Sequence, residues 1–284
     1  MSTLSIDQAM HSVQQLPSLP SVVGQLLDLF NAENPDSAAI GRAFDRDQAL
    51  AARVLRVANS AFYGMPGRVG SVQAAMVVLG LRNLRNLTLA AAVTTSFPAF
   101  TSDWFDQKGF WLHSLAVAQG ADVLAQRAGM HQQAAFTAGL LHDIGRLVLV
   151  TGFPEHARRA ALYQREHDCG TAEAERAVLG LDHALIGSAL AQRWKFPAGV
   201  QQAIARHHAP AADGAGAAPD TLVDLLHLAD VTAHALDLSG DPHERVPCLD
   251  SGAWHRLGLR WPAYGAALPE IEQRSADAGC LLAA

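Results

Sequence analysis

The chain has 284 residues, of which 50% are hydrophobic and 6% aromatic, so it is long enough for one large core or two compact units. Its net charge of −6 disfavours a general nucleic-acid binder, because such proteins usually carry a basic excess. Cys169, Cys248 and Cys280 form no CxxC motif and indicate a reducing compartment. The N-terminus has no apolar signal core, and no apolar run reaches about 18 residues. We therefore expect a cytoplasmic protein without a membrane or nucleic-acid partner.

Helical periodicity dominates the chain, and no alternating run of polar and apolar residues predicts a strand. A short leading helix is expected to end at Pro17, and Pro20 fits the first turn of the next helix. Asp47 and Ser71 are predicted to cap two later helices, with a Gly/Pro turn between them. Another helix is expected over about 81–96.

The helical pattern restarts near Trp104, and we place a boundary between two helical units at about residue 100. Further helices are expected at about 104–128, 131–150, 155–166, 172–179, 183–194, 198–207 and 221–238. The segment from Gly240 is richer in Pro and Gly, and short helices are expected near Trp254 and over about 270–280. The sequence thus predicts an all-α protein with a leading helix (1–15), two packed helical subdomains (16–100 and 101–240) and a C-terminal extension (241–284).

Histidine and aspartate residues recur inside these apolar helices, where a buried charge is unfavourable unless it is paired, hydrogen-bonded or bound to a metal. Imidazole and carboxylate together suit Fe, Mn or Zn. His142 and Asp143 are adjacent in "AGLLHDIGRLVLV", and positions about 100° apart on a helix can face one edge of a cavity. Asp143 could then bridge two ions that activate water against a phosphate ester. The candidate ligands are His113, His142, Asp143, His183, His207, His208 and Asp230.

Each candidate also fits a structural role when it is taken alone. A single histidine on a helix, such as His113, is more often a hydrogen-bonded core residue, and the dipeptide HD arises readily by chance. His207 and His208 near a helix end would favour the helix dipole, and Asp230 also fits a local cap or pair. The prediction of a site therefore depends on the ordered set. The other histidines are interpreted as surface or packing residues: His11, His131, His156, His167, His227, His234, His243 and His255.

The ordered set resembles the HD superfamily of metal-dependent phosphohydrolases, in which an early histidine, an HD pair and a closing aspartate hold one ion. This resemblance assigns those positions to His113, His142, Asp143 and Asp230. Two-metal members, such as the HD-GYP phosphodiesterases of cyclic di-GMP, have further ligands that correspond to His183, His207 and His208.

The chain departs from the HD-GYP enzymes at several positions. Arg146 stands where their "HDIGK" has lysine, which keeps the positive charge but changes its geometry. The acidic residue that follows their histidine pair is Ala209 here. The "DGAG" at 213–216 has the wrong offset for their Gly-rich loop and no tyrosine, so we interpret it as a flexible loop. Hydrolysis of cyclic di-GMP is therefore disfavoured.

The segments "LPSLPSVVGQLLDLF", "DQALAARVLRVANSAFYG", "VQAAMVVLGLRNLRNL" and "AFTAGLLHDIGRLVL" are similar to successive signatures of the HDOD family, the HD-related output domains of bacterial signalling. The similarity extends over about 16–238. It implies that the second subdomain is an HD-like helical bundle and that the chain is regulatory and acts by contact with a signalling protein. The ligand set that this sequence retains predicts one or two ions of Fe, Mn or Zn. The nearly full ligand set keeps an alternative open, a metal-dependent phosphohydrolase of a nucleotide or phosphodiester in which Asp143 and Arg146 are catalytic.

Two further groups of residues have open interpretations. Arg82 and Arg85 lie three residues apart on one predicted helix face, which is either solvated or faces a phosphate or an acidic partner. An aromatic cluster near the expected boundary is interpreted as packing between the two halves, with a partner groove as the alternative. Its members are Trp104, Phe105, Phe110 and Trp111.

Overall fold

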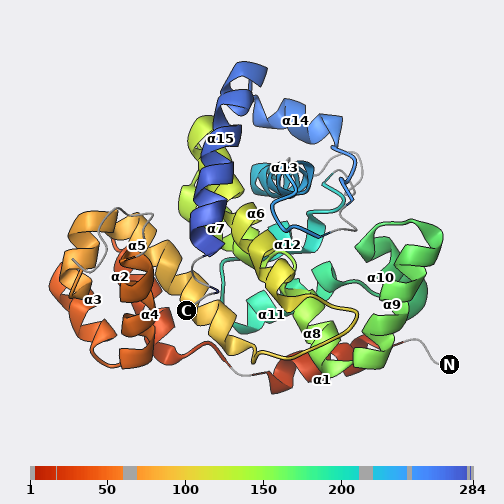
Figure 1. The fold of residues 1–284 in the computed structure, drawn as a ribbon, viewed down its shortest axis with the longest axis horizontal. Helices are drawn as coiled ribbons and strands as arrows, with labels where there is room; N and C mark the ends of the chain where they lie inside the picture. Colours follow the sequence, from red (N-terminus) through yellow and green to blue (C-terminus); the bar gives the residue numbers. More distant parts are fainter. Residues whose placement is uncertain are drawn as a thin grey trace. The chain divides into compact units, whose positions relative to one another are not determined.

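The computed structural model describes residues 4–16, 18–59, 69–210, 220–241, 245–279 and 282. Within these ranges every regular element is a helix and none is a strand, which confirms the predicted all-α class (Figure 1). Residues 60–64 of "NSAFYG", the "DGAG" at 213–216 and Cys280 lie outside the described residues. The backbone divides into two compact units: the first unit contains residues 17–98 and 276–284, and the second unit contains residues 1–16 and 99–275.

The first unit is a small helical bundle in which α2 contacts α3 and α5, and α4 contacts α5. The predicted N-caps are confirmed, because the side chains of Asp47 and Ser71 accept hydrogen bonds from the backbone N–H groups of Leu50 and Ala74. Gly80, with φ of 75°, kinks the last helix. The helices are α2 (Ser21–Asn31), α3 (Ser37–Phe44), α4 (Gln48–Ala58) and α5 (Val72–Ser96).

Arg85 is a buried structural residue of the first unit. Its side chain donates hydrogen bonds to Asn31 Oδ1 at 3.1 Å and to Asn86 Oδ1 at 3.3 Å. Both interpretations of a solvated or ligand-facing arginine pair are therefore wrong for Arg85, because burial requires its donors to be satisfied internally. The contact with Asn31 ties α5 to the end of α2.

The second unit is a larger bundle built around the long helix α6, which packs against α7 and α13. The short helix α11 contacts α8 and α12, and the leading helix α1 packs on α8 and α11. The helices are α1 (Ile6–Gln15), α6 (Gln107–Ala128), α7 (Gln132–Leu141), α8 (Ile144–Gly152), α9 (Pro154–His167), α10 (Thr171–Leu179), α11 (His183–Arg193), α12 (Ala198–Arg206), α13 (Thr221–Ala235), α14 (Ser251–Leu257) and α15 (Trp261–Ala278).

Two glycines allow the helices that carry polar residues to approach one another closely. A Cβ atom on Gly145 would overlap the carbonyl oxygen of His183, so only glycine allows α8 to pack this tightly on α11. A Cβ atom on Gly139 would lie 2.7 Å from the Cα of Ala118, which sets the approach of α7 to α6. Both contacts bring the residues around the HD pair towards α6 and α11.

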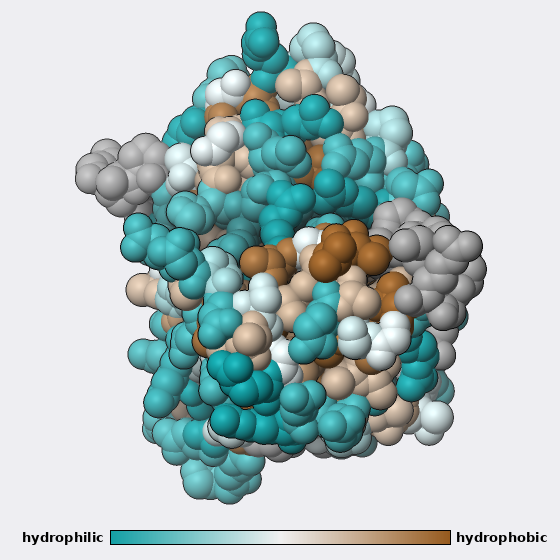
Figure 2. Space-filling model, turned by 90° about the vertical axis from the view of Figure 1, so that its left-hand side faces the viewer, coloured by the Kyte–Doolittle hydropathy of each residue, from teal (hydrophilic) through white to brown (hydrophobic). Residues whose placement is uncertain are grey.

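Two segments, α5 and residues 132–152, are long and apolar enough to cross a membrane. Most of each segment is buried inside the protein, as is usual for the core helices of a soluble domain. Hydrophilic residues cover much of the face shown in Figure 2, beside a smaller group of hydrophobic residues. The structure therefore favours core packing as the role of both apolar segments.

Candidate metal centre

The pair His142–Asp143 lies at a break between two helices. Helix α7 ends at Leu141, and Asp143, with φ of −99° and ψ of 5°, precedes the first residue of α8. The prediction of one helix over 131–150 is therefore wrong, because an apolar run can continue across a change in helix direction without changing its pattern. The break leaves both side chains in one buried cluster of His and Asp side chains, the His/Asp cluster, with His142 Nε2 3.6 Å from Asp143 Oδ1.

The second unit brings all seven predicted ligands together. Their donor atoms form overlapping groups, and the atoms within each group lie within 4.8 Å of one another. The groups are Asp143 with His183, His207 and His208; His113 with His142 and Asp143; His142 with His207 and Asp230; and His113 with Asp230 and His234. His234 is an addition to the predicted set. The role of these residues as ligands stays a prediction.

One half of the His/Asp cluster is centred on Asp143. Its Oδ1 lies 2.9 Å from His183 Nε2 and 3.7 Å from His207 Nε2, while its Oδ2 accepts a 3.0 Å hydrogen bond from Arg146. His208 Nε2 lies 2.8 Å from His183 Nε2. Helices α8, α11 and the end of α12 thus supply this half.

The other half is centred on Asp230, near the middle of α13. Three imidazole nitrogens surround its Oδ1: His113 Nε2 at 3.1 Å, His234 Nε2 at 3.4 Å and His142 Nε2 at 3.5 Å. His113 Nε2 also lies 3.2 Å from His142 Nε2. Helices α6, α7 and α13 therefore meet at one carboxylate oxygen.

Hydrogen bonds to groups outside the His/Asp cluster orient three of its imidazoles. The Nδ1 atoms of His142 and His207 each lie 2.8 Å from a backbone carbonyl oxygen, of Gly139 and Ile204 respectively. A carbonyl oxygen can only accept a hydrogen bond, so these Nδ1 atoms carry a proton. The Nε2 atoms face the other members of the His/Asp cluster. His183 Nδ1 lies 2.6 Å from Glu175 Oε2, the carboxylate–imidazole arrangement that commonly supports metal ligands.

The electrostatics keep both carboxylates ionised and His183 protonated. Burial lowers the pKa of His183, but the charges of Glu175 and Asp143 outweigh it and raise the pKa to about 10. Burial raises the pKa of Asp143, yet His142 and His183 hold it well below its usual value. The pKa of Asp230 is also raised by burial and held well below its usual value, because nearby imidazoles donate hydrogen bonds to it.

The donor set fits a transition metal. His207 Nε2 is buried and has no hydrogen-bond partner among the described residues, and the only ion-pair contact of Asp143 Oδ1 shorter than 3.5 Å is that with His183 Nε2 at 2.9 Å. Such atoms are unfavourable in a core, and a cation placed among them would satisfy both. Nitrogen and carboxylate donors are those of Fe, Mn and Zn sites. The observed atoms therefore agree with the donor set expected of a divalent ion.

Arg146 lies at the edge of the His/Asp cluster. Besides its hydrogen bond to Asp143, its guanidinium carbon lies 5.7 Å from the ring centroid of Phe105 and 5.9 Å from that of Phe110. Phe110 and Trp111 are buried, and the ring of Phe105 is tilted against that of Phe110, with their centroids 5.8 Å apart. Part of the predicted aromatic cluster thus holds Arg146.

Two residues of this site were not predicted from the sequence. Glu175 on α10 accepts hydrogen bonds from both the backbone and the ring of His183, yet it is eight residues away and has no motif around it. His234 was assigned to the surface or to packing, although it follows Asp230 by four residues. That i, i+4 spacing was the available signal, because it places two side chains on one helix face. The packing assignment is therefore incomplete for His234, whose ring belongs to the His/Asp cluster.

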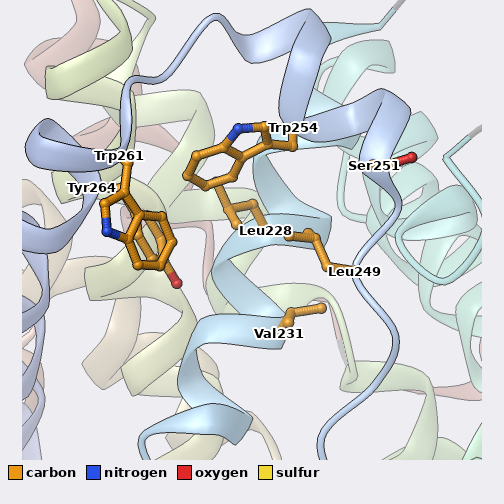
Figure 3. A pocket seen from close by; sticks show the side chains of 7 residues that line it. All are labelled: Leu228, Val231, Leu249, Ser251, Trp254, Trp261 and Tyr264. Carbon is orange, nitrogen blue, oxygen red and sulfur yellow. The ribbon is translucent and has the colours of Figure 1, made fainter.

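A cavity of about 470 Å³ lies on another face of α13, between that helix, α14 and α15 (Figure 3). Trp254 faces Trp261 and Tyr264, with ring centroids 6.0 and 5.2 Å away. Tyr264 Oη also lies 2.9 Å from Thr232 Oγ1. The lining is almost entirely apolar: Leu228, Val231, Leu249, Ser251, Trp254, Trp261 and Tyr264. Packing of the C-terminal helices on α13 explains this cavity, and the cluster of ionisable groups lies elsewhere.

The helical fold and the His/Asp cluster together define an HD-like domain. Residues 16–210 match the HDOD domain family, and the chain belongs to that family, which confirms the resemblance stated from its motifs. The chain is 31% identical to a candidate phosphohydrolase of Shewanella amazonensis SB2B, with a TM-score of 0.77 over 97% of this chain and 98% of that one.

Two further proteins are similar to the chain in fold or in sequence. An HDOD domain protein with unknown function from Geobacter sulfurreducens shares the fold, with 23% identity and a TM-score of 0.71 over 98% of this chain and 94% of that one. An uncharacterized protein of Treponema pallidum (strain Nichols) is 30% identical over 243 residues, which are 83% of this chain and 45% of that protein. The chain thus spans less than half the length of this relative.

Proposed function

We propose that the chain is a regulatory HDOD module of bacterial signalling that binds one or two divalent ions of Fe, Mn or Zn and acts by contact with a signalling protein. The observation that carries the proposal is the position of Arg146. Its guanidinium donates to Asp143 and lies over Phe105 and Phe110, so its charge is already engaged. An arginine held in this way orients a ligand and is poorly placed to bind a substrate phosphate.

A metal-dependent phosphohydrolase of a nucleotide or phosphodiester is the second candidate function. The convergence of the donor atoms and the 31% identity to the Shewanella candidate phosphohydrolase favour it. A bound ion would supply a Lewis acid and a water of lowered pKa. In this function Asp143 would hold the ion, and Arg146 would bind phosphate only after releasing Asp143.

Metal analysis combined with a turnover assay separates the two functions. Protein purified without chelator and supplied with Mn, Fe or Zn is analysed for bound metal, and hydrolysis of bis(p-nitrophenyl) phosphate is compared with that of Asp143→Ala. We expect metal in the wild type, little in the variant and no turnover above the variant's background. Turnover that is lost in Asp143→Ala would favour the phosphohydrolase. A wild type that binds none of the three metals would contradict both functions.

A further inference from the structure

We propose that His234 is an additional ligand of the ion held by Asp230, alongside His113. The proposal rests on the metal-binding function above and adds one imidazole to the ligands of that ion. His234 belongs neither to the HD pattern nor to the added histidines of the two-metal pattern.

The position of His234 places its ring at the Asp230 carboxylate. The two residues are four apart on α13 and lie on the same helix face, with His234 Nε2 3.4 Å from Asp230 Oδ1. The ring of His234 also lies 4.4 Å from that of His113, centroid to centroid. Ligands of a single zinc ion at about 2.0–2.2 Å are separated by up to roughly 4.4 Å. The spacing of His113, Asp230 and His234, within 4.8 Å of one another, is close to that limit.

Hydrogen bonding alone accounts poorly for this arrangement. Three Nε2 atoms approach the single Oδ1 of Asp230 within 3.5 Å, whereas a carboxylate oxygen has about two lone-pair sites. A cation between these atoms would turn the crowded lone pairs into ligands. A simple i, i+4 ion pair on the helix surface would not need His113 and His142 at the same oxygen.

An additional protein ligand would occupy a coordination position that water or substrate could otherwise take. Catalytic zinc sites keep a coordination position open for water or substrate, whereas structural sites fill their positions with protein ligands. The side chain of His234 is 24% exposed and those of His113 and Asp230 are 6% and 3% exposed, so His234 lies on the outer side of this half. His234 would therefore occupy the position from which a substrate would approach. The Asp230 ion is then a structural or sensing ion.

Zinc binding by the full chain tests the proposal. Metal-free wild type, His234→Ala and the control His255→Ala are titrated with Zn²⁺ against a chromophoric chelator, and the zinc-loaded proteins are studied by X-ray absorption. His255 is a suitable control because it is an exposed histidine on α14. We expect His234→Ala to bind one zinc ion at least about tenfold more weakly and to show fewer imidazole ligands per zinc. The control should match the wild type.

The outcomes distinguish this proposal from the metal-binding function. Wild-type affinity and imidazole count in His234→Ala would overturn the role of His234 and leave the metal centre intact. A wild type that binds no zinc, iron or manganese would overturn both. If His234→Ala does not fold, as judged by circular dichroism, His234→Gln replaces it, because glutamine keeps a polar side chain of similar length. The same loss of affinity is expected for that variant.

Discussion

The two carboxylates of the His/Asp cluster, Asp143 and Asp230, are neutralised in different ways. Asp143 contacts the guanidinium of Arg146 and the ring of His183, whose pKa of about 10 means that it carries a proton at neutral pH. Asp230 is surrounded by three imidazoles, and burial lowers the pKa of one of them, His113. The Asp143 half thus holds positive charge of its own without metal, and a cation must displace a proton there. Similar ligand sets can therefore differ in how pH controls metal binding.

The largest expected effect comes from removing the ligand that the two halves share. Asp143 belongs to a complete donor group in each half, whereas Asp230 shares only His207 with the donors of the Asp143 half. We expect Asp143→Asn to weaken zinc binding in both halves by roughly 100-fold or more, because a direct ligand contributes more than a residue that only supports one. Isothermal titration of the metal-free proteins with Zn²⁺ measures the effect.

Asp230→Asn is the matched control for that experiment. It should weaken only the ion of its own half and leave the ion held by His183, His207 and His208 in place. If both variants lose the same ions to the same degree, the halves are a single site and the comparison fails.

Proton release on metal binding is the next largest effect. Zinc can bind His183 Nε2 only after its proton leaves, so below its pKa of about 10 the apparent affinity of the Asp143 half should rise about tenfold per pH unit. Binding measured from pH 6.5 to 9 should show one ion with this slope. The ion of the Asp230 half should respond less steeply, and two ions with equal slopes would show that the two halves do not differ in this way.

The stability of the metal-free protein tests the cause of this linkage. The pKa of His183 is raised on folding from 6.5 to about 10, so its stabilising contribution is complete below pH 6.5 and is lost as pH rises towards 10. Glu175→Gln removes one of the two carboxylates responsible, and we expect its denaturation midpoint to fall less over this range. Urea unfolding of chelator-treated protein at several pH values measures the difference. An unchanged pH dependence in Glu175→Gln would show that Glu175 does not set this pKa.

How far the sequence predicted these features depends on the range of each interaction. The ordered His and Asp set could be found because the helices are strongly periodic and the polar residues interrupt their apolar faces. The break at His142–Asp143 could not, because it depends on Gly139 and Gly145 letting α7 and α8 pack on other helices. Glu175 reaches His183 through the packing of α10 near α11, which no local pattern records.

The two extra histidines of α13 show the limit more closely. His227 precedes Asp230 by three residues and His234 follows it by four, so either spacing places a ring near the aspartate on the helix. His227 points away from the His/Asp cluster. Its Nδ1 lies 2.8 Å from the carbonyl oxygen of His207, and its Nε2 accepts a hydrogen bond from the N–H of Asp250. Of these two histidines, His234 is the one that contacts Asp230. Neighbouring elements, not helix periodicity, make that distinction.

The smallest expected effect comes from Arg146, and it tests whether positive charge alone sets the Asp143 half apart. Burial lowers the pKa of Arg146, but Asp143 and Glu175 outweigh it and raise the pKa, so its charge persists at any working pH. Arg146→Lys keeps the charge but loses the planar contact with Phe105 and Phe110. We expect zinc affinity to fall only a few-fold and the free energy of unfolding to fall by about 1 kcal/mol. Arg146→Met, which keeps an unbranched apolar side chain without the charge, should weaken binding more than lysine does if Arg146 orients the ionised Asp143. Equal effects of the two variants, measured by the same titration, would mean that packing on the phenylalanine rings is its main contribution.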